Sequence, residues 1–215
     1  MIFEIQQTKT NFNMVWIAEQ NGKSIATAIC PFEKGQVNII VDYSDKDRYC
    51  LSYNPNDSSR GNSLIDRFSF QVIHDGNMVG TIAGLNKKVK GFLQSYPYRV
   101  MKLQNEAYYL YEVGFGNEGL YLCIYRGDEL IAIADKDLKV INFRDHYTVY
   151  AANECDLKVI MPLMMHYDIT AHGDMMEIAV RSVKKKIVNT IQRELIAKYD
   201  PTFIPTIKQQ DGVID

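Results

Sequence analysis

The stretch CDLKVIMPLMMHYD, residues 155–168, contains the densest apolar run of the chain, at 159–165. It is too short to cross a bilayer, which takes about 20 apolar residues in a helix. As a helix, it would carry apolar side chains in every direction, and such a helix is buried on all sides. The run therefore predicts an apolar helix near 156–168, in the interior of the fold.

Pro162 lies inside this predicted helix. An interior proline removes a hydrogen bond and costs about 3 kcal/mol or more, whereas a proline in the first turn is tolerated. We therefore expect the helix either to kink at Pro162 or to begin near it.

Three similar hairpins dominate the residues before this run. They are MVWIAEQNGKSIATAIC (14–30), FSFQVIHDGNMVGTIAG (68–84) and LYLCIYRGDELIAIADK (120–136). Their turns read Asn-Gly, Asp-Gly and Gly-Asp, which are typical of tight hairpin turns with positive φ. After each turn a β-branched residue precedes a small one. The hairpins start 54 and then 52 residues apart, which indicates either repeated units or chance similarity among hairpins.

Further short segments rich in β-branched and aromatic residues predict strands. These segments are 2–5, 37–42, 48–53, 98–103, 108–115 and 146–151. With the hairpins they make about twelve short strands, typical of a sandwich or barrel. A wide barrel needs its interior filled, and the apolar run supplies a helix to fill it. The sequence thus predicts a mainly β fold, a closed antiparallel barrel of about twelve strands around a central apolar helix, spanning residues 1–170.

The C-terminal part of the chain shows a different pattern. Apolar residues at 176, 180, 183, 187, 191 and 195 follow helical spacing, and Pro201 marks a stop. We expect an appended amphipathic helix within 171–200, and residues 201–215 to form a tail.

The barrel segments resemble the tubby C-terminal-like superfamily. The resemblance rests on VIHDGNMVGTIAG (72–84), YLYEVGFGNEGLYLCIYRGDELIAIADK (109–136) and DHYTVYAANECDLKVIMPLMMHYD (145–168), with Asp168 matching an aspartate at the end of the family's helix. It covers residues 1–170 and is closest to the LURP-one-related and phospholipid scramblase-like branch. The resemblance implies a barrel around a central helix and association with membrane lipid headgroups, particularly phosphoinositides.

The charges of the chain predict where an anionic partner would bind. A net charge of −2 gives no global attraction to nucleic acid or to an anionic membrane, so binding needs a local patch. Two basic clusters stand out: Lys87, Lys88 and Lys90 beside a turn, and Arg181, Lys184, Lys185 and Lys186 on the polar face of the predicted C-terminal helix. They favour a non-catalytic binding module that associates with anionic membrane lipids. The alternative is a protein-interaction or scaffold domain that oligomerises through that helix.

No motif in the sequence predicts catalysis, a metal site or a cofactor. The segment HYDITAHGD (166–174) holds metal-ligand residue types, but its spacing matches no strong signature. Asp145, Glu154 and Asp156 are too scattered for calcium. An enzyme acting on a small molecule in the barrel mouth remains a third alternative. The four cysteines are widely spaced, and the start of the chain lacks a secretory pattern. We expect free thiols and a cytoplasmic, membrane-peripheral protein.

Overall fold

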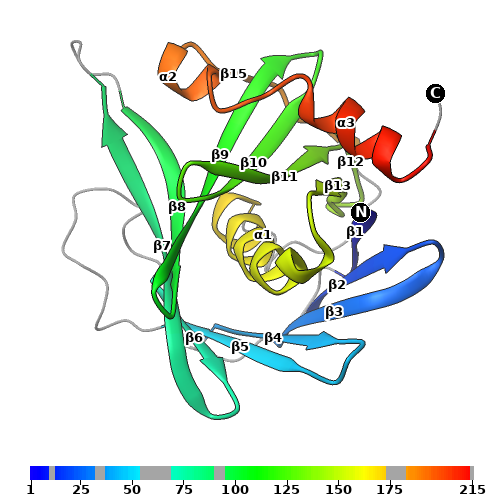
Figure 1. Ribbon diagram of the computed structural model, residues 1–215, viewed down its shortest axis with the longest axis vertical. Coiled ribbons are helices and arrows are strands. Elements are labelled where there is room, and N and C mark those ends of the chain that lie inside the picture. The colour runs from blue at the N-terminus through cyan, green and yellow to red at the C-terminus, as the bar shows by residue number, and fades with distance from the viewer. Residues whose placement is uncertain (10–12, 32–36, 54–68, 90–94, 173–182, 214–215) are drawn as a thin grey trace.

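The structure, a computed structural model, describes residues 1–9, 13–31, 37–53, 69–89, 95–172 and 183–213. Twelve of the described strands follow one another around a closed ring (Figure 1). They are β1 (Ile2–Lys9), β2 (Asn13–Gln20), β3 (Lys23–Pro31), β4 (Asn38–Tyr43), β5 (Arg48–Tyr53), β6 (Phe70–His74), β7 (Asn77–Lys88), β8 (Ser95–Leu103), β9 (Glu106–Gly116), β10 (Leu120–Arg126), β11 (Glu129–Lys136) and β13 (His146–Ala151).

Pairing between β9 and β10 closes this ring. From β10 it continues through β11 and β13 to β1, and then in chain order to β9. Every neighbouring pair is antiparallel, so no barrel strand among the described residues has an open edge. The predicted closed antiparallel barrel of about twelve strands is confirmed.

The antiparallel order gives the barrel two different ends. The connections β2–β3, β4–β5, β6–β7, β8–β9 and β10–β11 are tight and lie together at what we call the turn end. The opposite ends of these strands define what we call the loop end. Between β11 and β13 this end carries β12 (Lys139–Ile141).

The three predicted hairpins form β2–β3, β6–β7 and β10–β11, which occupy every fourth position around the ring. Each has a register shift, and in each the residue left out of register is the β-branched one after the turn: Ile25, Val79 or Ile131. The small residue that follows then resumes the pairing. The sequence pattern shared by the hairpins is therefore a β-bulge, which bends and twists a strand.

Helix α1 (Leu157–His172) lies inside the ring of strands (Figure 1). It follows the short 3-10 helix η2 (Glu154–Asp156) and continues through Pro162, so the alternative that it begins near Pro162 is wrong. Its apolar side chains at 159–165 are buried in one cluster with inward-facing strand residues such as Trp16 and Leu51. The second half differs from the predicted apolar helix, because His166 and Asp168 are also buried there.

The predicted amphipathic helix is wrong for the part of 171–200 that the structure describes. Residues 183–199 instead form β14 (Val183–Lys185), β15 (Val188–Asn189) and the short helix α2 (Arg193–Ile196). β14 pairs with β12, and β15 pairs with the last residues of β9. These strand partners override the helical spacing of the apolar residues, since tertiary pairing outweighs local propensity.

The predicted tail also contains a helix, α3 (Phe203–Gln210). With α2 it covers the outside of the barrel, where Leu195, Tyr199 and Phe203 pack with the outward-facing Val113 and Cys123. Phe203 and Ile204 of the predicted tail thus belong to a second small core.

Candidate functional site

The feature that stands out at the loop end is the two-stranded ribbon of β12 and β14, which we call the lysine ribbon. Its register places Lys139 opposite Lys185, Val140 opposite Lys184, and Ile141 opposite Val183. Because side chains alternate along a strand, the first and last of these pairs share one face.

All four side chains of that face are exposed to solvent. Ile141 is 49% exposed and Val183 65%, which is unusual for large apolar residues placed directly opposite each other. Lys139 and Lys185 are also exposed, and neither makes an ion pair with a residue that the structure describes. Like charges directly opposite each other destabilise a strand pair, so this arrangement does not serve the stability of the ribbon.

The other face of the lysine ribbon carries Val140 and Lys184, and Lys184 is also exposed. The ammonium of Lys184 lies 4.1 Å from the ring centroid of Phe143, a cation–π contact. Lys186, just after β14, is half-buried; its backbone N–H donates to the carbonyl of Leu138 at 2.8 Å. These contacts join β12 to β14, and the ammonium of Lys186, 5.9 Å from the ring centroid of Tyr167, connects the end of the ribbon to the barrel interior.

The turn that follows β12 has an uncommon backbone. Asn142 and Phe143 have φ angles of 53° and 58°. Positive φ is tolerated by Asn but is an outlier for a bulky aromatic residue. Phe143 is nevertheless buried, at 7% exposed. Strain of this kind persists only where surrounding contacts hold it.

The structure separates the residues of the two predicted basic clusters. Lys87 forms an ion pair with Glu194 of α2 at 2.9 Å, whereas Lys88 is exposed at the end of β7. Lys90 and Arg181 lie outside the described residues. Of the second cluster, Lys184 and Lys185 belong to the lysine ribbon, and Lys186 turns toward the barrel interior.

A buried polar cluster underlies this end of the barrel, around Asp168 of α1. The indole N–H of Trp16 donates to one carboxylate oxygen of Asp168 at 2.9 Å, and the hydroxyl of Tyr147 donates to the other. Lys136 forms an ion pair with Asp145, and its ammonium also lies 3.4 Å from the Tyr147 hydroxyl. The carboxylate of Asp168 thus connects α1 to β2 and β13.

A second set of contacts holds the same half of α1 to β8 and β9. The guanidinium of Arg99 lies 4.5 Å from the ring centroid of Tyr167 and donates to the Thr170 hydroxyl at 3.3 Å. The Tyr167 hydroxyl in turn donates to Glu112. Charged side chains of three barrel strands therefore surround one turn of the helix.

Burial shifts the protonation of this cluster. It raises the pKa of Asp168 and of Tyr147, and it lowers the pKa of Lys136 to about 8. The opposite charges of Lys136 and Asp168 counteract each other's pKa shifts, whereas the charge of Asp168 raises the pKa of Tyr147 further. We interpret the cluster as structural, because its charged groups are engaged with one another inside the barrel.

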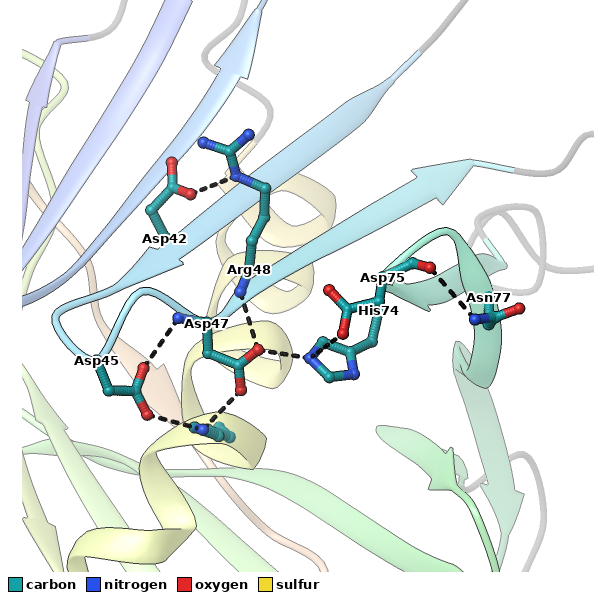
Figure 2. A network of polar contacts seen from close by, with 8 residues as sticks. Asp42, Asp45, Asp47, Arg48, His74, Asp75 and Asn77 are labelled. Atoms are coloured by element: carbon teal, nitrogen blue, oxygen red, sulfur yellow. Dashed lines mark hydrogen bonds and ion pairs between the residues drawn. The ribbon is translucent and has the colours of Figure 1, made fainter.

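At the turn end, the contacts at the start of α1 are of a different kind. Lys158 reaches out to Asp45 at 2.9 Å and to Asp47 at 2.6 Å, both in the β4–β5 turn. Figure 2 shows Asp47 also facing His74, whose Nε2 lies 2.5 Å from the carboxylate. The ring of His74 stacks on Tyr49. Because these groups are at least partly exposed, they stabilise the fold less than buried pairs.

The described residues offer little for metal or redox chemistry. No three His, Cys, Asp or Glu side chains among them are grouped so as to hold a metal ion. Cys30, Cys50 and Cys123 are free thiols, as expected, and burial raises the pKa of Cys123 to about 12. Of the HYDITAHGD segment, His166 packs edge-on against Phe70, while 173–174 lie outside the described residues.

Comparisons with protein families, with curated proteins and with solved structures find no match to this chain. None of the described helices is long and apolar enough to span a bilayer.

The sequence analysis missed half of the lysine ribbon. It singled out Lys184 and Lys185 but assigned them to a helix, and it did not include Lys139 or Ile141. The available signal was the pair of β-branched residues Val140 and Ile141, which favour a strand. Its pairing with residues of the C-terminal segment could not be read from either segment alone.

Proposed function

We propose that this protein binds peripherally to anionic membrane surfaces through the lysine ribbon. The observation that carries the proposal is the exposed face on which the pair Lys139 and Lys185 adjoins the pair Ile141 and Val183. An anionic surface relieves the repulsion between the two lysines, and the headgroup region accepts the two apolar side chains.

The energies of such a contact are moderate but additive. A lysine near an anionic membrane contributes about 1 kcal/mol, and this attraction falls off within a Debye length. Apolar burial contributes roughly 25 cal/mol per Å² removed from water. Ile187, 50% exposed just beyond β14, extends the apolar part of the surface. A reversible, salt-sensitive association at the cytoplasmic face of a membrane is the expected behaviour.

The resemblance to tubby-like proteins supports the same proposal. We propose that the chain is a tubby-like barrel of the LURP-one-related and scramblase-like branch, with α1 as its central helix. Lipid headgroup binding is what that resemblance implies, and the ribbon provides a surface for it. We assign no residue from the family itself, because the proposal rests on the ribbon's own charges and exposure.

We propose a binding role rather than catalysis. In the part of the chain that the structure describes, the buried ionisable groups around Asp168 contact each other and hold α1. The scaffold alternative depended on an amphipathic helix at 175–199. In the described part of that segment Leu195 and Tyr199 pack on the barrel, whereas Val183, Ile187 and Ile191 are exposed. We favour the membrane because the exposed apolar residues adjoin lysines.

Flotation with vesicles tests the proposal. We expect the protein to float with vesicles that contain 30% phosphatidylserine, less at high salt, and not with neutral vesicles. Lys139→Glu combined with Lys185→Glu should weaken binding roughly 30-fold, since about 2 kcal/mol of attraction is lost.

The matched control is Lys23→Glu combined with Lys102→Glu. These lysines are exposed toward the turn end, and the net charge of the two double variants is the same. Equal binding of the ribbon variant and the control would contradict the proposal. The triple change of Lys87, Lys88 and Lys90 to Glu tests the other predicted cluster in the same assay.

A further inference from the structure

The chain from Val183 to Ile191, which we call the rim segment, runs along the loop end of the barrel from β12 to β9. Its first part, β14, pairs with β12, and β15 near its end pairs with the last residues of β9. Exposure alternates along its second half, where 187, 189 and 191 are exposed and 186, 188 and 190 are half-buried. Such alternation is typical of an extended chain that lies with one side on a surface.

The exposed side of the rim segment is rich in large apolar side chains. Ile187 is 50% exposed and Ile191 72%, and they follow Val183, which is 65% exposed opposite Ile141 of β12. Because alternate residues of an extended chain share a side, the two isoleucines continue the row that begins with Val183 and Lys185. Single exposed apolar residues are common, but several that follow one another along one rim indicate an interaction surface.

The half-buried side of the rim segment fixes its backbone to the barrel. The contacts of Lys186 with Leu138 and Tyr167 hold one end of its second half. At the other end the N–H of Thr190 donates to the carbonyl of Gly114, and the N–H of Gly114 donates to the Thr190 hydroxyl, both at 2.9 Å. The isoleucine between these contacts is therefore presented to a partner without the cost of ordering a loose chain.

We propose that the rim segment selects membranes with loosely packed headgroups, such as strongly curved ones; the inference rests on the proposed membrane binding. The surface has four large apolar side chains for the two lysines of the ribbon face. Any anionic surface attracts the lysines, whereas an apolar side chain gains only where it reaches the boundary with the acyl chains. In a tightly packed leaflet the headgroups must first separate, but a strongly curved leaflet already has gaps between them.

Flotation with phosphatidylserine vesicles of one composition, prepared as small sonicated and as large extruded vesicles, tests this inference. At equal outer-leaflet lipid we expect the wild type to bind the small vesicles about tenfold more tightly. Ile187→Ser combined with Ile191→Ser should weaken binding to the small vesicles about tenfold and abolish most of the preference. Met78→Ser combined with Val213→Ser, which removes two exposed apolar side chains elsewhere, is the matched control and should change neither. Since all four residues are exposed, both variants should melt like the wild type.

Lys139→Glu combined with Lys185→Glu separates this inference from the proposed function. It should weaken binding to both vesicle sizes by the same factor and leave the preference for small vesicles intact. Equal binding of the wild type to both sizes, with weaker binding of the lysine variant, would overturn the inference and leave the proposed function in place. A preference for small vesicles that the isoleucine variant retains would overturn it as well. No binding of the wild type to either size would overturn both.

Discussion

The two ends of the barrel use charged side chains in opposite ways. At the turn end, charges at the start of α1 pair with each other near the surface, as Lys158 does with Asp45 and Asp47. At the loop end, the charged groups are either buried inside the barrel, as Asp168 and Lys136 are, or placed opposite a like charge on the neighbouring strand, as Lys139 and Lys185 are.

This difference shows which charges hold the fold and which are available to a partner. Surface pairs contribute little to stability because water competes for them. A buried carboxylate is costly to leave unpaired, so the contacts of Asp168 fix α1 within the barrel. Lys139 and Lys185 form no ion pair with a described residue and do not contact α1, so we assign them to binding.

The largest effect is expected from Asp168→Ala. It leaves the indole N–H of Trp16 and the hydroxyl of Tyr147 buried without their acceptor, and it removes one of the two negative charges near Lys136, which keeps its ion pair with Asp145. We expect the free energy of unfolding to fall by about 3–5 kcal/mol, measured by urea denaturation. Asp168→Asn, which keeps an acceptor, should be intermediate, and Glu118→Ala should have no effect. A loss for Asp168→Ala as small as that for Glu118→Ala would contradict the structural role of the cluster.

The next effect is expected from Gly114→Ala, which tests how the C-terminal segment is held at the loop end. A Cβ on Gly114 would lie 2.3 Å from the carbonyl oxygen of Val188, so β15 must move away. We expect a loss of about 1–3 kcal/mol, the usual cost of overpacking. Limited proteolysis should then cleave within 183–199 while the barrel stays intact. Unchanged protection of that segment would show that β15 is not held there.

A smaller effect is expected from Ile141→Ser combined with Val183→Ser. Both side chains are exposed, so the melting temperature should not fall. Vesicle binding should weaken about tenfold, and the loss should persist at high salt because it removes apolar burial rather than charge. Flotation at two salt concentrations measures it, with Met78→Ser, an exposed apolar residue at the turn end, as the control. Equal losses for both changes would contradict a specific ribbon surface.

The smallest effect is expected from Lys158→Met at the turn end. Hydrogen bonds from Lys158 lower the pKa of Asp45 and Asp47 below the usual 3.8. A depressed carboxyl pKa stabilises the fold above the unfolded-state pKa, and this contribution is lost as the pH falls through the folded-state value. The variant should therefore melt slightly below the wild type at pH 7 and at the same temperature near pH 2. A difference that persists at low pH would show that the ion pairs are not its cause. Lys23→Met, an exposed lysine of the same end, is the control.

Much of the turn end could be predicted from the sequence, because its structure is local. The Asn-Gly and Asp-Gly pairs specify tight turns, and each places a bulge at the β-branched residue that follows. The apolar run at 159–165 likewise predicts that α1 is buried. The loop end depends on residues far apart in the chain. Nothing near Asp168 reveals Trp16 or Tyr147 as partners, and β14 is a strand only because β12 lies beside it.

Depth-dependent quenching by brominated lipids tests the central claim most directly. The single natural tryptophan, Trp16, is fully buried and provides a constant background. A tryptophan introduced by Val183→Trp on the lysine ribbon is expected to be quenched by anionic vesicles of brominated lipid, whereas one introduced by Met78→Trp at the turn end is not. Quenching at 78 equal to or greater than that at 183, or none at either position when the protein is bound, would contradict membrane binding through the lysine ribbon.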